Sequence, residues 1–395
     1  MNLKALLATA AAGAFLMVAA CGGGSSDGGS SDSGSNGGGT GSSGAGGGGT
    51  GDSGGTGNSG GTSNSGGTGN SGPTNSTAQY VAIDLHASGF DVTGGLGIGD
   101  GEQAGVGGIQ FGDAVLPNHA LLWRGSASSV VDLNPTGFDN SEAFATSGGI
   151  QVGVGWNNAG GGVQHALKWT GSAGSVVDLH PSGYFSSVAD GIGGDQVVGF
   201  GQATTGASKH ALLWTSVGVV DLNPPGGSSL ATATDGRQQV GSGNPAGGGV
   251  NHALLWSGTA ASVVDLHPAK GFDLSEATGV GGGQQVGVGF IGLGPGTVSH
   301  ALLWTGSAGS VVDLHPRSGF SSTLASAVAA GRQVGYGITN AGPAHALLWN
   351  GTADSVVDLH VFLPPGYGSS VASGIDASGN VIGQAGGHAI LWVRQ

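Results

Sequence analysis

From about Gln79 onward the chain alternates short apolar runs with turn residues, and this arrangement returns about every 45 residues. One period contains four such runs, Ser175–His180, Ser186–Ile192, Gln196–Phe200 and His210–Trp214. The runs are rich in Val, Leu and aromatic residues and are bounded by Gly, Ser, Pro and Asp, which predicts short β-strands separated by tight turns. Outside the N-terminus no segment places apolar residues at helical spacing.

Two sequence strings mark the period, and each occurs seven times. His-Ala-Leu-Leu-Trp, or a close variant, begins at His119, His165, His210, His252, His300, His345 and His388. Val-Val-Asp-Leu, or a close variant, contains Asp84, Asp132, Asp178, Asp221, Asp265, Asp313 and Asp358. Four strands per period match a blade of a β-propeller, whereas the coils of a β-solenoid usually need only about 20–30 residues. We therefore predict an all-β, seven-bladed β-propeller over residues 78–395, with a β-solenoid as the second choice.

The phase of the repeat predicts how the ring closes. The repeats open with a strand of the Asp type, Val81–His86, and end with a strand of the His type, His388–Trp392. The first strand is therefore left over, and we expect it to become the outer strand of the last blade, which removes an exposed sheet edge. This phase places stretches of small residues, such as Ser141–Ala145 and Ser228–Ala233, on the innermost strands, where the blades converge.

The histidines predict a polar network within each blade. All 12 belong to the repeat: seven begin the His-Ala-Leu-Leu-Trp string, and five follow the Asp-Leu string, where Asn134 and Asn223 stand in the other two units. If Trp169 pairs with Val176, antiparallel register places Leu167 opposite Asp178 and His165 opposite His180.

Two His and an Asp on one face resemble a zinc site, but seven copies and the Asn replacements favour a structural network in which Asp accepts from imidazole or from the indole N–H. The predicted network residues are His119, Asp132, His165, Asp178, His180, His252, Asp265, His267, His300, Asp313, His315, His345, Asp358, His360 and His388.

Candidate ligand-binding residues lie in the variable connections between blades. These connections carry an aromatic residue in nearly every unit, namely Phe90, Phe138, Tyr184, Phe272, Phe320 and Tyr367. Such a ring of aromatics suits a glycan or a peptide ligand, but capping of the blades explains it better. Glu142 and Glu276 on the inner strands are a weak candidate for an acid/base pair, because glycosidases hold their carboxyls about 5–10 Å apart.

Composition narrows the function classes. The chain has 23 acidic and 9 basic residues and a net charge of −14, which argues against nucleic acid as a partner. Its 89 Gly fit turns, strands and linker rather than helices. Cys21 is the only cysteine, so we expect no disulfide and no Cys-based metal site, and we predict neither a metal nor a cofactor.

The N-terminus predicts export and lipidation. Residues 1–20 combine Lys4 with an apolar run, and residues 21–77 are rich in Gly and Ser, which predicts a disordered tether. Val18-Ala19-Ala20-Cys21 resembles a bacterial lipobox, which implies a lipid anchor on Cys21 and a place on the cell envelope, with Gly22 favouring the outer membrane. The alternative is a plain secretory signal followed by a coincidental cysteine.

The repeat as a whole resembles the bacterial extracellular HAF-repeat family. Gln196-Val-Val-Gly199 and Gln285-Val286-Gly287 match the family's second strand element, and the His-Ala-Leu-Leu-Trp strings match its third, with Leu where the family has Phe. The resemblance covers about 78–395 and implies an extracellular repeat protein without assigned chemistry. We therefore expect a monomeric binding or envelope-interaction module, with a polysaccharide hydrolase or lyase using carboxylates at the channel mouth as the alternative.

Overall fold

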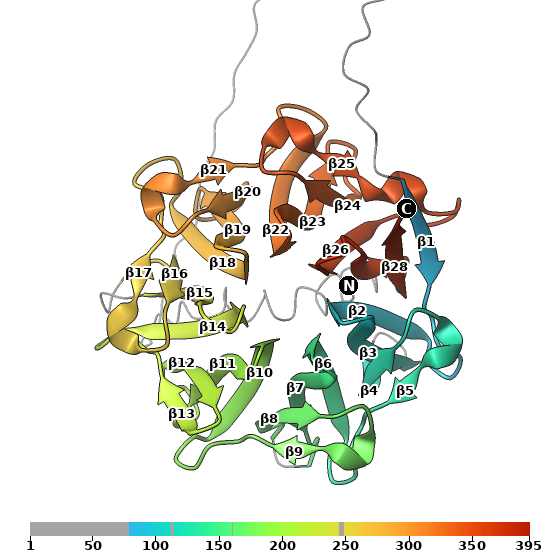
Figure 1. The fold of residues 1–395 in the computed structure, drawn as a ribbon, viewed down its shortest axis with the longest axis vertical. Coiled ribbons are helices and arrows are strands. Elements are labelled where there is room, and N and C mark those ends of the chain that lie inside the picture. Colours follow the sequence, from blue (N-terminus) through green and yellow to red (C-terminus); the bar gives the residue numbers. More distant parts are fainter. Residues whose placement is uncertain (1–78, 112–113, 160, 245–248) are drawn as a thin grey trace, which may run out of the picture. The chain divides into compact units, whose positions relative to one another are not determined.

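The computed structural model describes residues 79–111, 114–159, 161–244 and 249–395. They form seven four-stranded antiparallel sheets, which are arranged around a common axis as the blades of a β-propeller (Figure 1). The predicted fold class and blade number are confirmed. The predicted signal peptide, the lipidated Cys21 and the tether lie outside the described residues.

Six blades follow one another along the chain, each running from the innermost to the outermost strand. Blade 1 comprises β2 (Val92–Gly99), β3 (Glu102–Phe111), β4 (Ala114–Trp123) and β5 (Val131–Asp132). Blade 2 comprises β6 (Asn140–Ser147), β7 (Ile150–Trp156), β8 (Gln164–Trp169) and β9 (Val177–Asp178). Blade 3 comprises β10 (Ser186–Gly193), β11 (Gln196–Gln202), β12 (Lys209–Thr215) and β13 (Gly218–Asp221).

The second half of the ring repeats this order. Blade 4 comprises β14 (Ser228–Thr234), β15 (Gln239–Asn244), β16 (His252–Trp256) and β17 (Val264–Asp265). Blade 5 comprises β18 (Leu274–Gly281), β19 (Gln284–Ile291), β20 (Val298–Trp304) and β21 (Val312–Asp313). Blade 6 comprises β22 (Phe320–Ala329), β23 (Arg332–Thr339), β24 (Ala344–Trp349) and β25 (Val357–Asp358). Blade 7 comprises β26 (Ser370–Ile375), β27 (Val381–Ala385), β28 (His388–Arg394) and β1 (Tyr80–Asp84).

The only helices in the described ranges are short 3₁₀ turns. Five of them lie between the third and fourth strands of their blades, at η1 (Ala127–Ser129), η2 (Ala173–Ser175), η3 (Ala260–Ser262), η4 (Ala308–Ser310) and η5 (Ala353–Ser355). The sixth, η6 (Leu359–Phe362), follows β25. None of these segments has the length or apolar character to span a membrane.

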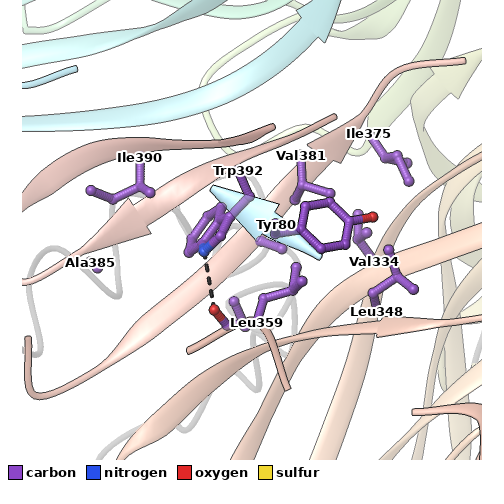
Figure 2. Packing of buried hydrophobic residues seen from close by; sticks show 11 residues of the cluster. Tyr80, Val334, Leu348, Leu359, Ile375, Val381, Ala385, Ile390 and Trp392 are labelled. Atoms are coloured by element: carbon purple, nitrogen blue, oxygen red, sulfur yellow. Dashed lines mark hydrogen bonds between the residues drawn. The ribbon is translucent and has the colours of Figure 1, made fainter. Parts of the chain in front are cut away.

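The predicted left-over strand closes the ring. β1 pairs with β28 from Tyr80↔Arg394 to Asp84↔Ile390. Tyr80 then packs in the core of the last blade, and the Trp392 indole N–H donates to the Leu359 carbonyl at 3.1 Å (Figure 2). The two ends of the repeat region are thereby joined by a ladder of hydrogen bonds as well as by apolar contact.

Every inner strand carries a β-bulge at the equivalent position of the repeat, and the bulge bends the strand. In blade 5 the irregularity lies between Ala277 and Gly279. The partner strand meets the bend with a glycine: a Cβ on Gly287 would collide with the carbonyl oxygen of Glu276. The equivalent glycines, one per blade, are Gly105, Gly153, Gly199, Gly241, Gly287, Gly335 and Gly383. The close approach of the two strands at the bulge thus explains why this position of the repeat is glycine in all seven blades.

The tryptophans of the third strands fill the space between blades. Trp304, which is fully buried, packs against Leu255 and Leu266 of the preceding blade. Its indole N–H has no hydrogen-bond partner among the described residues. The same holds for four other blades, so the predicted option of an indole N–H bond to Asp is wrong, and these side chains act through packing.

In two blades the indole N–H of this tryptophan does have a hydrogen-bond partner, and the residue opposite the tryptophan on the second strand explains the difference. In five blades the Trp pairs with a buried glutamine, as in Gln285↔Trp304. The Gln285 side chain instead bonds Gly306 N and the Gln238 side chain of the preceding blade. Where Val197 or Val381 replaces the glutamine, the indoles of Trp214 and Trp392 donate to backbone carbonyls of the preceding blade. Six of the seven interfaces therefore have a polar link of one of these two kinds, whereas the Gln103 side chain bonds only within blade 1.

Candidate functional site

The His and Asp of the repeat meet as the register predicted. Leu167 pairs with Asp178 in the hairpin of blade 2, and His165 Nδ1 lies 2.8 Å from Asp178 Oδ2. The other Asp178 oxygen accepts from the His180 backbone N–H at 2.8 Å. The rings of His165 and His180 stack with centroids 4.2 Å apart. Because a carboxylate only accepts, His165 carries its proton on Nδ1.

In five units a second histidine links the blade to the next one. Ser187, on the inner strand of blade 3, accepts from the Ala166 N–H of blade 2 and lies 2.8 Å from His180 Nδ1. His180 Nε2 lies 3.0 Å from the Tyr184 carbonyl oxygen. The carbonyl can only accept, so Nε2 carries the proton and Nδ1 accepts from the Ser187 hydroxyl. Both nitrogens of the neutral His180 ring are therefore hydrogen-bonded, and the bond to Ser187 joins blades 2 and 3.

Asparagine reproduces this arrangement in the two units that lack the second histidine. The Asn134 side-chain oxygen accepts from Ser141 Oγ at 2.6 Å, and its amide donates to the Phe138 carbonyl at 3.3 Å. Asn223 makes the equivalent bonds to Ser229 and Gly227. In the last blade the network spans the closure, with His388 Nδ1 2.7 Å from Asp84 Oδ2.

The remaining His–Asp contacts have the same geometry. They join His119 to Asp132, His210 to Asp221, His252 to Asp265, His300 to Asp313 and His345 to Asp358, all at 2.7–2.8 Å. The second histidines His267, His315 and His360 each contact a Ser or Thr hydroxyl of the following inner strand. Within the described part of the chain, no three His, Cys, Asp or Glu residues are grouped so that they could hold a metal ion.

The aromatic residues of the connections lie against the blades. Phe272 is partly buried, meets the His300 ring edge-on at 5.9 Å, and covers Gly289, where a Cβ would come within 2.5 Å of the phenyl ring. Phe90, Phe138, Tyr184 and Phe320 cover the equivalent glycines of their own blades, and Tyr367 meets the His388 ring edge-on. These contacts show a packing role, and each of these side chains remains partly exposed.

The inner strands enclose a cavity of about 250 Å³ on the propeller axis. All seven inner strands contribute to its wall, and the bulged residue of each strand is part of it. These bulged residues are Leu96, Phe144, Asp190, Thr232, Thr278, Ser326 and Ser373. A bulge turns one extra side chain toward the axis in each blade, so the cavity wall varies in chemistry although the backbone repeats.

Two carboxyl groups line this cavity, Asp190 and Glu276. Glu276 is only 8% exposed, and burial raises its pKa to about 7. Burial likewise raises the pKa of Asp190 to about 7, an effect that the Lys209 charge opposes. The predicted partner Glu142 is not in the wall, because its carboxylate accepts from Asn118 Nδ2 at 2.9 Å. The Glu142–Glu276 pairing across the channel is therefore wrong.

Asp190 is the site residue that the sequence did not reveal. It lies in an Ala-Asp-Gly stretch that reads as part of the small inner strand, and the other blades have Leu, Phe, Thr or Ser at this position. Comparison of the seven inner strands at the bulge would have singled it out. Without knowledge of the bulge, simple alternation does not tell which residues of that stretch face the axis.

Comparisons with known proteins are informative only about the fold. No family model matches the sequence, and no curated protein matches it. A prolyl endopeptidase structure is similar, with a TM-score of 0.52 and 14% identity over 76% of this chain and 47% of that one.

Two further structures show a weaker likeness. The β-propeller domain of the trilobed protease from Pyrococcus furiosus has a TM-score of 0.49 at 10% identity, covering 78% of this chain and 96% of that one. An acylaminoacyl peptidase has a TM-score of 0.49 at 12% identity, covering 77% of this chain and 51% of that one. This chain thus spans about half the length of the peptidases, and the likeness is that of their propeller fold.

Proposed function

We propose that the protein is an extracellular binding module whose ligand enters the central cavity of the propeller. The observation that supports this most is the cavity itself, which all seven inner strands line and in which the buried Glu276 carboxyl has no hydrogen-bond partner among the described residues. Buried polar groups without partners are rare in folded proteins and call for a partner such as an ordered water or a bound ion. The size suits a small polar molecule or the end group of a larger glycan or peptide.

The place of this module is proposed from the sequence alone. The lipobox-like segment before Cys21 and the Gly/Ser-rich stretch after it support an exported lipoprotein tethered to the cell envelope. The HAF-like repeat supports an extracellular location. Replacing Cys21 with Ala tests the anchor: we expect an unlipidated protein that leaves the membrane fraction, and retention of a fully processed variant on membranes would contradict the anchor.

Closing the cavity tests the binding function. Ser326 lines the wall at the position that Phe144 occupies on β6. Ser326→Phe therefore adds an aromatic ring to the cavity wall at a position where another blade already has one. We expect small sugars, amines or amino acids that raise the melting temperature of the unmodified protein to lose this effect in the variant. Equal shifts in both proteins, or none in either, would contradict binding in the cavity.

A second candidate function is hydrolysis of a polysaccharide. The observation that favours it is the pair of cavity carboxyls, because a carboxyl with a pKa of about 7 suits a general acid at neutral pH. The assay is release of reducing ends from bacterial polysaccharides by the purified protein. Turnover that disappears in Glu276→Gln while ligand binding persists would favour the enzyme over the binding module.

A further inference from the structure

We infer that the central cavity binds a small organic cation, with ammonium groups held by Asp190 and Glu276. This inference rests on the proposed binding function and adds the chemical class of the ligand. The two carboxyls come from blades 3 and 5. Asp190 is the bulged residue of its strand, whereas Glu276 precedes the bulged residue of its strand by two positions. Two carboxyls at different depths suit a ligand with two separated ammonium groups.

The charge of the wall points to a cation. The residues that line the cavity include two carboxyls and no Lys, Arg or His. The Lys209 charge acts on Asp190, but Lys209 Nζ lies over the Phe200 ring at 4.4 Å and Lys209 does not line the cavity. A buried carboxylate is costly unless a positive charge or hydrogen-bond donors compensate it, and a cationic ligand supplies both.

The two cavity carboxyls differ in this respect from other carboxyls near the inner strands. Glu142 accepts from Asn118 Nδ2, and Glu102 forms a 2.7 Å ion pair with Arg124. Asp190 and Glu276 have neither a hydrogen bond nor an ion pair among the described residues. Ser242, also in the wall and only 1% exposed, likewise has no partner there. The cavity wall thus contains two carboxyls and a serine hydroxyl that make no bond to the described residues.

Two threonine hydroxyls of the wall can only accept hydrogen bonds from a ligand. Thr232 Oγ1 donates to the Ala277 carbonyl at 2.8 Å, and Thr278 Oγ1 donates to the Ala325 carbonyl at 2.7 Å. A hydroxyl has one proton, so only the acceptor lone pairs of these two side chains remain for a ligand. An ammonium group offers three donors and no acceptor, whereas an anionic ligand would meet acceptors and carboxylates.

The experiment is calorimetric titration of the folded protein with 1,4-diaminobutane, and with 1,4-butanediol as a neutral molecule of the same length. We expect the diamine to bind and the diol to bind at least about tenfold more weakly. Glu276→Gln and Asp190→Asn should each weaken diamine binding by about tenfold or more. Both changes remove a buried charge at nearly constant size, so we expect the variants to fold, which their melting curves report.

Glu142→Gln is the matched control, because Glu142 stands at the same position of β6 as Glu276 on β18 but does not line the cavity. It should leave diamine affinity within about twofold. Equal binding of diol and diamine, or of a neutral sugar alone, would overturn the cationic class and leave the binding function intact. Diamine binding that survives both cavity substitutions would overturn the assigned site. Failure of diamine, diol and sugar to bind at all would overturn both proposals.

Discussion

The outer hairpins of this propeller carry the same polar side chains in every blade, whereas the positions of the inner strands that line the cavity differ from blade to blade. The His–Asp contact occurs in all seven blades at 2.7–2.8 Å. On the inner strands, carboxyls line the cavity in only two blades, at Asp190 and Glu276, and they have no partners there. In a repeat protein, what recurs with all its bonds made serves the fold, and what departs from the repeat with unused bonds marks a site.

The largest effect should come from breaking the repeated backbone geometry. In Gly287→Ala the new Cβ collides with the Glu276 carbonyl oxygen, which cannot move without disturbing the bulge. We expect a loss of about 3 kcal/mol or more in the free energy of unfolding, measured by denaturant titration. Gly309→Ala is the control, because nothing lies within 4 Å of its Cβ and the equivalent residue of η3 is Ala261. A harmless Gly287→Ala would show that the bulge does not require glycine.

The Glu142 carboxyl, which has no counterpart in most blades, should destabilise the fold at high pH. Burial raises the pKa of Glu142 to about 7, so the folded state holds a proton that the unfolded chain releases from about pH 4.5 upward. Stability from this group is therefore lost as the pH rises from about 4.5 through 7. We expect Glu142→Gln, which keeps the bond from Asn118, to be more stable by about 2 kcal/mol at about pH 8 and unchanged at about pH 4. The measurement is denaturant unfolding at both pH values, and a gain at the lower pH would contradict the explanation.

Breaking one copy of the repeated network should cost less. Asp178→Ala removes the acceptor of His165 Nδ1 and of the His180 N–H, and the site is half-exposed, so water partly replaces the carboxylate. We expect a loss of about 1 kcal/mol in thermal or chemical unfolding at about pH 7. Asp354→Ala is the surface control, since this residue only meets Arg317 at 3.9 Å and is 79% exposed. Equal effects of the two changes would deny the network a structural role.

The smallest effect concerns the second histidine and shows most clearly in acid. Burial, and then the charge of His165, lower the pKa of His180. The folded state therefore binds fewer protons than the unfolded chain just below the ordinary His pKa, and stability from this group, present above about pH 6.5, is lost as the pH falls through that value. His180→Asn copies the native Asn134 arrangement, so we expect a change within about 0.5 kcal/mol at about pH 7. Its stability should fall less than that of the unmodified protein on acidification, which melting curves across this pH range would detect.

The blades, the ring closure and the hairpin register could be predicted from the sequence. The sevenfold period, the four strands per unit and the left-over first strand predicted the blades and their closure, because strand and turn signals are local and recur in every unit. The spacing of His165, Asp178 and His180 predicted the hairpin register, since side chains alternate with a period of two along a strand. The aromatic connections were located but their contacts were not, because the glycines that they cover lie on a different strand.

Only the tertiary structure decided which residues meet at the axis. The bulge on each inner strand breaks the simple alternation of side chains and places Asp190 in the cavity wall. Glu142 instead accepts a hydrogen bond from Asn118, which lies on β4 of the preceding blade. The indole partners were also decided there, because whether Trp304 or Trp214 makes a bond depends on a glutamine or valine on the adjacent strand and on a carbonyl of the preceding blade. Local pattern fixes strands and register, whereas convergence of seven separate strands on one axis is a property of the closed ring.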